Sequence, residues 1–227
     1  MDFITNIFDF FLPRFCPSCK IKLLPPDKFV CSSCLNNIKH ADEKRLKLEF
    51  ERKFCDKKIV TGFYSLFVFE KDKELQYIIH SIKYKGRFLI GTFLGHELGK
   101  KIKSEIQGWN INLILPVPLH QLKKAERGYN QSFYIAKGLS RELNIPIASR
   151  ILRRKKYTQS QTKMNLIERQ QNIDAAFRIK NREKIKGENI LLIDDVITTG
   201  ATISECGKVL LDSGAKRIYA ASVAIAD

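Results

Sequence analysis

The sequence predicts an α/β fold with a parallel sheet, preceded by a small domain that carries four cysteines. Two short apolar segments, Asn112–Pro116 and Ile190–Ile193, are each followed by a polar loop and then by a segment with helical periodicity. This repeated strand–loop–helix order is most economically folded as parallel strands joined by right-handed crossovers. The run at Ile190–Ile193 is unbroken, which suits a central strand buried on both faces.

Composition and charge limit the class of protein. The chain has 227 residues, of which 44% are hydrophobic, so it can build one ordinary domain and a small appendage. No run approaches the roughly 20 apolar residues of a membrane span, so no transmembrane segment is expected. The first residues lack the basic region and cleavage site of a secretory signal, so we expect a cytoplasmic protein. The net charge of +16 favours a polyanionic partner, whether nucleic acid, a phosphorylated sugar or an acidic membrane.

The first four cysteines form two C-x2-C pairs separated by a short polar hairpin, namely Cys16, Cys19, Cys31 and Cys34. Four thiolates at this spacing can converge tetrahedrally on zinc. A segment this polar could hardly fold without such a metal cross-link. Two disulfides, or reduced cysteines in an ordinary loop, are the alternatives, but without an export signal the thiols should stay reduced. We therefore predict a structural zinc ion, and we interpret Cys55 and Cys206 as buried or incidental.

The segments before residue 110 are expected to be mainly helical. Met1–Leu12 has apolar residues at helical spacing and predicts a short amphipathic helix docked on the body, with a membrane-surface foot as the alternative. The charged residues 35–58 are interpreted as a partly helical linker, and the aromatic, β-branched residues 60–69 as one or two strands. Periodic apolar positions predict helices at 74–84 and 88–106.

The later segments alternate between strand and helix. The expected elements are a basic loop at 119–128, a helix at 129–143, the start of a strand at 145–147, a helix at 203–211 and a final strand at 218–224. Between them, residues 151–180 form a long polar connection, which in a compact domain is usually functional or disordered. An idle solvated loop is the alternative.

Two carboxylates and a hydroxyl-rich loop follow the strand at Ile190–Ile193. Asp194 and Asp195 come where the strand should end, and ligands of open α/β sheets bind at that end. The loop that leads into the next helix consists of Thr198, Thr199, Gly200, Ala201 and Thr202. Such a loop presents N–H groups and hydroxyls to an anion. An ordinary turn with a threonine helix cap is the alternative. Since carboxylates repel bare phosphate, the pairing suggests a ligand with hydroxyls and a phosphate, such as ribose 5-phosphate.

The run Ile190–Thr202 resembles the signature of type I phosphoribosyltransferases, an apolar strand followed by D-D-V-x-T-T-G-x-T. The resemblance implies that Asp194 and Asp195 hold the ribose hydroxyls of 5-phosphoribosyl-1-pyrophosphate (PRPP), and that the loop Thr198–Thr202 holds its 5-phosphate. It also implies a Rossmann-like parallel sheet with a hood above it. Mg²⁺ would accompany PRPP.

The same resemblance suggests where pyrophosphate would bind. In these enzymes the loop after the first core strand binds pyrophosphate, and Arg127 and Gly128 are the matching candidates here. A flexible lid, which closes over the reacting ribose and excludes water, lies at the position of the long connection. Its candidate contacts to pyrophosphate or nucleic acid are Arg153, Lys155, Lys156 and Gln161.

Three features together resemble the ComF family of competence-associated, phosphoribosyltransferase-like proteins. They are the four-cysteine knuckle, the run P-V-P-L-x8-R-G-Y-N-Q at Pro116–Gln131, and the run T-x2-Q-x9-R-x2-N-x3-A-F at Thr158–Phe177. The resemblance spans nearly the whole chain and implies a zinc knuckle joined to a phosphoribosyltransferase domain, with an association with DNA uptake in natural transformation. Many relatives carry further cysteines after the second pair, whereas only Cys55 remains here, so a second metal site is not expected.

Two functions and one domain division follow from these observations. We expect residues 1–58 to hold the N-terminal helix, knuckle and linker, and residues 59–227 to hold the phosphoribosyltransferase-like domain, with a hood at 59–110 and a core at 111–227. The first function is binding of Mg²⁺-PRPP, with transfer of its phosphoribosyl group to an unknown nitrogen acceptor. The alternative is a non-catalytic competence factor that binds single-stranded DNA and other competence proteins.

Overall fold

The centre of the molecule is a parallel sheet of four strands. The structure is a computed structural model, and it describes residues 13–154 and 176–226. The strands are β1 (Val60–Val68), β2 (Leu113–Pro116), β5 (Asn189–Ile197) and β6 (Arg217–Ile225), and their order in the sheet is β1-β6-β5-β2. All three neighbouring pairs are parallel, so their carboxyl ends share one edge. The predicted α/β class with a parallel sheet is confirmed.

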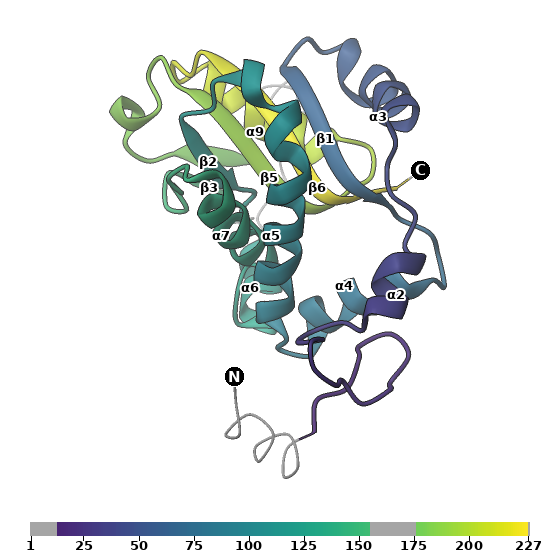
Figure 1. The fold of residues 1–227 in the computed structure, drawn as a ribbon. Helices are drawn as coiled ribbons and strands as arrows, with labels where there is room; N and C mark the ends of the chain where they lie inside the picture. The colour runs from purple at the N-terminus through teal and green to yellow at the C-terminus, as the bar shows by residue number, and fades with distance from the viewer. Residues whose placement is uncertain (1–12, 155–175, 227) are drawn as a thin grey trace, which may run out of the picture.

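The buried run of β5 is shared between two layers of helices. Leu191 and Ile193 belong to the cluster packed against α4 (Glu74–Tyr84), α5 (Phe88–Glu105) and α7 (Gln131–Leu143). Ile190 and Leu192 point the other way, toward the side covered by α9 (Ala201–Leu211). Figure 1 shows α5 and α7 in front of the sheet and α9 behind it. A strand covered on both faces has no polar side, which explains its unbroken apolar sequence.

Helices α4, α5 and α7 follow their predicted patterns. Helix α4 buries Leu75, Ile78, Ile79 and Ile82 on one face, and α5 covers nearly the predicted range. Helix α7 begins after Asn130, whose side chain accepts a hydrogen bond from the Ser132 backbone N–H and so caps the helix. A 3-10 turn, η2 (Gln107–Trp109), links α5 to β2.

The segment interpreted as a linker is an ordered part of the body. It forms α2 (Ser32–Asn37), α3 (Glu43–Phe50) and a π-helical turn, η1 (Glu51–Cys55). Ahead of α3 the chain runs along β1, where the Ala41 N–H donates to the Leu66 carbonyl at 3.1 Å. In Figure 1, α3 lies beside β1 at the outer edge of the sheet.

Three predicted elements differ in detail from the structure. The basic loop at 119–128 contains a helix, α6 (Gln121–Arg127), because its residues are good helix formers and Gly128 ends it in the left-handed region. Residues 145–147 add only an isolated parallel bridge, Ile114↔Ile147, in place of a strand. The long connection contains β3 (Leu152–Arg154) and β4 (Phe177–Ile179), an antiparallel pair, followed by a 3-10 turn, η3 (Arg182–Lys184).

One part of the predicted hood lies in the sheet itself. We expected residues 59–110 above the sheet, but β1 pairs with β6 over its length and forms an edge strand. The division at residue 58 stays a prediction. The predicted helix at Met1–Leu12 lies outside the described residues. Within residues 13–154 and 176–226, no helix combines the length and the apolar character needed to cross a membrane.

Candidate functional site

Asp194 and Asp195 lie inside β5, not after it as we expected. The pairing with β6 continues past them, through Val196 and Ile197, so the strand ends later. Asp194 is half-buried, and its Oδ1 accepts hydrogen bonds from the Ser132 hydroxyl and from the Asp195 backbone N–H, each at 2.9 Å. Because Ser132 lies in the first turn of α7, the start of that helix fixes this carboxylate.

Asp195 is more deeply buried and has a cationic partner. Its exposed fraction is 5%, and its Oδ2 lies 2.8 Å from Nζ of Lys83, near the end of α4. Its Oδ1 accepts from the Val196 N–H at 2.8 Å. The two neighbouring carboxylates therefore have different surroundings: Asp195 is paired with a cation, whereas Asp194 is held by neutral donors.

This difference affects the proton affinity of Asp194. Burial and then the charge of neighbouring Asp195 raise the pKa of Asp194 to about 7, against the opposing influence of the Asp195 N–H, Ser132 and Lys83. Near neutral pH, Asp194 can thus exist with or without its proton. A ligand hydroxyl that donates to this group favours the ionised form.

The loop Thr198–Thr202 forms a small recess of about 40 Å³ at the start of α9, next to Asp194. Gly200 has a φ of +72° and immediately precedes the helix, while Thr198 and Thr199 are exposed. The Ala201 N–H donates to the Thr199 hydroxyl at 3.4 Å. The recess therefore combines hydroxyl groups with the positive end of an eleven-residue helix, an arrangement suited to an anion.

The turn η1 packs against the back of this loop. A Cβ atom on Gly200 would lie 2.7 Å from Cε1 of Phe54 and 3.2 Å from Cβ of Lys53, so only glycine fits. Lys53 Nζ also donates to the Ala226 carbonyl at 2.9 Å, and the Ala226 N–H donates to Ile197, just before the loop. The linker segment thus supports the loop from behind.

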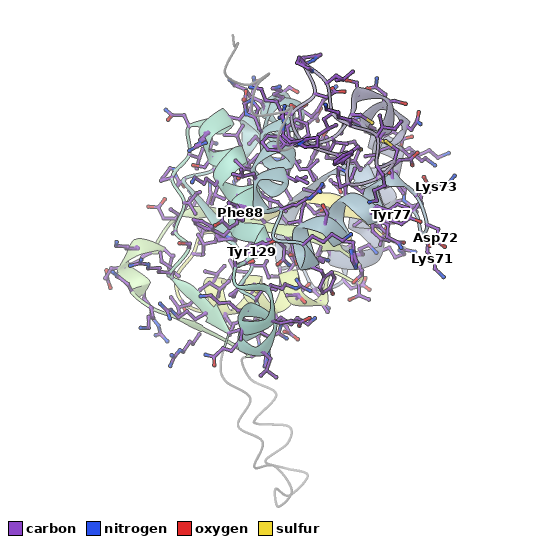
Figure 2. The ribbon with its side chains drawn as sticks, turned by 90° about the horizontal axis from the view of Figure 1, so that it is seen from below. Lys71, Asp72, Lys73, Tyr77, Phe88 and Tyr129 are labelled. Carbon is purple, nitrogen blue, oxygen red and sulfur yellow. The ribbon has the colours of Figure 1, made fainter. Side chains whose placement is uncertain are left out.

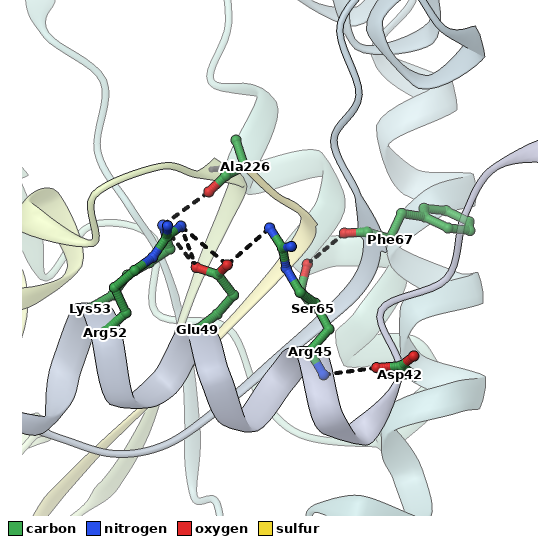
Figure 3. A network of polar contacts seen from close by, with 8 residues as sticks. All are labelled: Asp42, Arg45, Glu49, Arg52, Lys53, Ser65, Phe67 and Ala226. Atoms are coloured by element: carbon green, nitrogen blue, oxygen red, sulfur yellow. Dashed lines mark hydrogen bonds and ion pairs between the residues drawn. The ribbon is translucent and has the colours of Figure 1, made fainter.

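Figure 3 shows how Lys53 is held in place. Glu49 is 1% exposed, and its carboxylate pairs with Lys53 at 3.1 Å, with Arg45 at 2.9 Å and with Arg52 at 2.8 Å. Three cations around one buried carboxylate neutralise its charge. Removing Glu49 would leave Lys53 buried without its ion-pair partner.

The predicted pyrophosphate residues, Arg127 and Gly128, make their contacts outside this recess. Arg127 lies over the ring of Tyr84, with its guanidinium carbon 5.1 Å from the ring centroid and Nη2 3.3 Å from the hydroxyl. Gly128 follows it at a φ of +76°. Neither residue contacts Asp194 or Asp195 within the described part of the chain. Lys155, Lys156 and Gln161 lie outside the described residues.

Sequence reasoning missed the residues that hold the two acids and the loop. Lys83 belongs to the basic residues at the end of the helix predicted at 74–84, which suit a helix C-terminus or a ligand or phosphate contact, whereas Ser132, Lys53 and Phe54 carry no such signal. Each reaches a partner far along the chain; Ser132 and Asp194, for example, are 62 residues apart. No local pattern marks such pairs, so the fold was needed to find them.

The four cysteines converge as predicted. Their Sγ atoms all lie within 4.8 Å of one another, and those of Cys19 and Cys31 are 3.6 Å apart. A tetrahedral zinc site with Zn–S bonds of roughly 2.3 Å requires S···S distances of about 3.8 Å. The donor set and its spacing therefore fit a metal ion bound by four thiolates.

Comparisons with known proteins agree with this architecture. Residues 130–226 match the family described as Phosphoribosyl transferase domain. The chain is 28% identical to Competence protein F of Haemophilus influenzae, over 95% of this chain and 96% of that protein. It is 31% identical to DNA utilization protein YhgH of Escherichia coli K12, over 62% of this chain and 63% of that one. With Competence protein ComFC of Bacillus subtilis it shares 35% identity, over 45% and 39% of the two chains.

Solved structures of phosphoribosyl enzymes are partly similar. Glutamine phosphoribosylpyrophosphate amidotransferase from B. subtilis has a TM-score of 0.43 at 17% identity, covering 59% of this chain and 26% of that one. Purine phosphoribosyltransferase from Pyrococcus horikoshii has a TM-score of 0.39 at 19% identity, covering 59% and 74%. At these scores the likeness is partial and says nothing of substrate.

Proposed function

Since this chain belongs to the ComF family, with a phosphoribosyltransferase-like domain, we propose that it binds Mg²⁺-PRPP at the carboxyl edge of its sheet and takes part in competence. The observation that carries the proposal is the adjacency of two carboxylates and an anion recess on one strand–loop–helix unit. The ribose hydroxyls would donate to Asp194 and Asp195. The 5-phosphate would accept from the N–H groups and hydroxyls of Thr198–Thr202.

The division of labour between the acids supports this assignment. Asp195 is ion-paired with Lys83, and Asp194 is oriented by Ser132 at the start of α7. In the proposed pose both would accept hydrogen bonds from vicinal hydroxyls, and the phosphate would lie apart from them at the positive end of α9. Separate places for hydroxyl and phosphate are what a sugar phosphate requires.

Transfer to an acceptor would follow from the same pose. A nitrogen nucleophile would form a bond to C1 of the ribose as the bond from C1 to pyrophosphate oxygen breaks, through an oxocarbenium-like state. Mg²⁺ would neutralise the leaving pyrophosphate. Arg127 and Gly128, from the loop after β2, are the candidates to face that group, provided that Arg127 leaves Tyr84.

Calorimetric titration of Mg²⁺-PRPP into the wild type and into Asp194→Asn/Asp195→Asn tests the binding site. We expect binding to the wild type and its loss in the double variant. A folded wild type that binds no PRPP would reduce the motif to a remnant. Release of pyrophosphate with a panel of bases, abolished in Asp195→Asn, tests transfer separately.

The metal assignment accompanies this proposal. We propose zinc as the ion of the cysteine cluster, because four thiolates suit it and the ligands leave no position for a substrate. Its role would be structural, since it joins the two halves of a knuckle.

The net charge of +16 favours a second candidate function, the binding of single-stranded DNA without catalysis. The fold would then be a scaffold, and PRPP a regulator. Affinity for oligo-dT measured at increasing salt distinguishes the two: steep salt dependence together with absent pyrophosphate release would favour the scaffold. An affinity for oligo-dT that does not change with salt concentration would contradict this second function.

A further inference from the structure

A second, larger cavity lies beside the candidate phosphoribosyl site. Its volume is about 420 Å³, within the roughly 300–1,000 Å³ of small-molecule sites. It is enclosed by the segment between β2 and α6, by the start of α7 and by residues 149–154. Among the described residues, neither acid of β5 nor the loop Thr198–Thr202 lines it. The cavity is therefore a separate hollow on the same edge of the sheet.

The cavity is cationic. Lys124, Arg150, Arg153 and Arg154 line it, and no described carboxylate does. Arg153 also lies directly opposite Arg178 in the β3–β4 pair. Like charges at opposite positions destabilise a strand pair. Both side chains are exposed, so water and salt screen this repulsion, and the pair adds positive charge near the cavity.

One wall of the cavity is aromatic and firmly supported. Tyr129, Phe133 and Tyr134 line it, and the Tyr129 and Phe133 rings lie 5.6 and 5.4 Å from that of Tyr134. Phe88 packs on Tyr129 with a centroid distance of 5.6 Å, and Figure 2 shows the two side by side. The Tyr129 hydroxyl donates to the Ile82 carbonyl. A fixed aromatic wall suits the flat face of a base.

We propose that this cavity binds a nucleoside 5′-phosphate, either as a free nucleotide or as the terminal unit of a nucleic-acid strand. The phosphate would contact the arginines and the base would lie against the aromatic wall. Inorganic phosphate would contact only the arginines, and an uncharged nucleoside would contact only the aromatic wall.

The start of α7 is the partition between this cavity and the phosphoribosyl site. Asn130 lines the cavity and caps the helix, while Ser132, two residues on, donates to Asp194. A nucleotide here would lie next to a bound phosphoribosyl group. Its binding needs neither Asp194 nor Asp195, and of the described residues predicted to contact pyrophosphate it uses only Arg153.

Calorimetric titration with 2′-deoxythymidine 5′-monophosphate tests the proposal. The variant Arg150→Gln/Arg153→Gln should lose roughly tenfold or more in affinity, as expected for lost charge-assisted hydrogen bonds. The matched control, Lys101→Gln/Lys103→Gln, removes the same charge from exposed positions on α5 and should keep the wild-type affinity. Equal losses in both variants, or no binding to the folded wild type, would overturn the proposal.

Three further titrations locate the ligand and its source. Thymidine and inorganic phosphate should each bind much more weakly than the nucleotide. The variant Phe133→Ala should have a lower affinity for the nucleotide but an unchanged affinity for phosphate. Nucleotide binding should persist in Asp194→Asn/Asp195→Asn; its loss there would place the nucleotide in the phosphoribosyl site and contradict the proposal. A 5′-phosphorylated oligo-dT that binds more tightly than the mononucleotide would assign the strand terminus as the source, and equal affinity would assign the free nucleotide.

Discussion

Lys83 at the end of α4 places its ammonium group 2.8 Å from Oδ2 of Asp195, a carboxylate that is otherwise buried in the sheet. This ion pair connects a helix of the N-terminal half to the strand that carries the candidate site. The ion pair can be tested directly by substitution of Lys83.

Substitution Lys83→Met should lower the free energy of unfolding by roughly 1–3 kcal/mol, because it leaves a buried acceptor without its partner. Urea unfolding measures the loss. Lys83→Arg should recover much of the stability, and Lys85→Met, at an exposed position, is the control. Identical effects of Lys83→Met and Lys85→Met would contradict this role.

Asp194→Asn should stabilise the unliganded protein increasingly as the pH rises. The pKa of Asp194 is raised from 3.8 to about 7, so the folded state binds more protons than the unfolded state between these values. Wild-type stability therefore falls as pH rises through this window, whereas asparagine does not titrate. Thermal unfolding of both proteins from pH 4 to 8 checks this, with exposed Asp56→Asn as the control. A constant difference between wild type and Asp194→Asn would rule it out.

Gly200→Ala should cost more stability than the same change at Gly187. Both glycines have positive φ, +72° and +76°, so alanine is strained by about 1 kcal/mol at either position. Only at Gly200 does the new Cβ also meet Phe54, at 2.7 Å; at Gly187 it meets nothing within 4 Å. We expect a further loss of roughly 1–3 kcal/mol at Gly200. Calorimetric melting of the two variants measures the difference, and equal losses would show that η1 does not support the loop.

Purified protein should contain about one equivalent of zinc under reducing conditions. Cys16→Ser should lose the metal and melt at a lower temperature, because Cys16 is buried in the four-thiol cluster. Cys55→Ser is the matched control, since Cys55 is exposed and lies outside the cluster. Metal analysis and melting curves give both readouts. Wild-type zinc content in Cys16→Ser would remove that residue from the site.

Local patterns in the sequence predicted the parts of the fold that local patterns determine. The unbroken run at Ile190–Ile193 identified a strand buried on both faces, and the apolar positions of residues 74–84 identified α4. The cysteine spacing identified the cluster. In each case the signal and the structure occupy the same few residues.

What the sequence did not reveal depends on contacts between distant segments. The end of β5 is set by pairing with β6, so Asp194 and Asp195 lie within the strand although the apolar run stops before them. The charged residues 35–58 resemble a partly helical linker, but Glu49 and Lys53 are buried there and form an ion pair with each other. The basic residues 119–128 predict a loop, yet they contain α6, a short helix with no buried residue.

The position of β6 in the sheet has a consequence for how the protein is made. Strand β6 is an interior strand, between β1 and β5, yet it is synthesised after every other described strand. The bond from Lys53 to Ala226 likewise spans 173 residues. Until residues 217–226 emerge from the ribosome, β1, η1 and the loop Thr198–Thr202 therefore keep apolar surface exposed. Pairing between segments far apart in the chain is slow, and the partly folded intermediates are prone to aggregation. We therefore expect the yield of folded protein in cells to depend on chaperones more than the stability of the folded protein suggests.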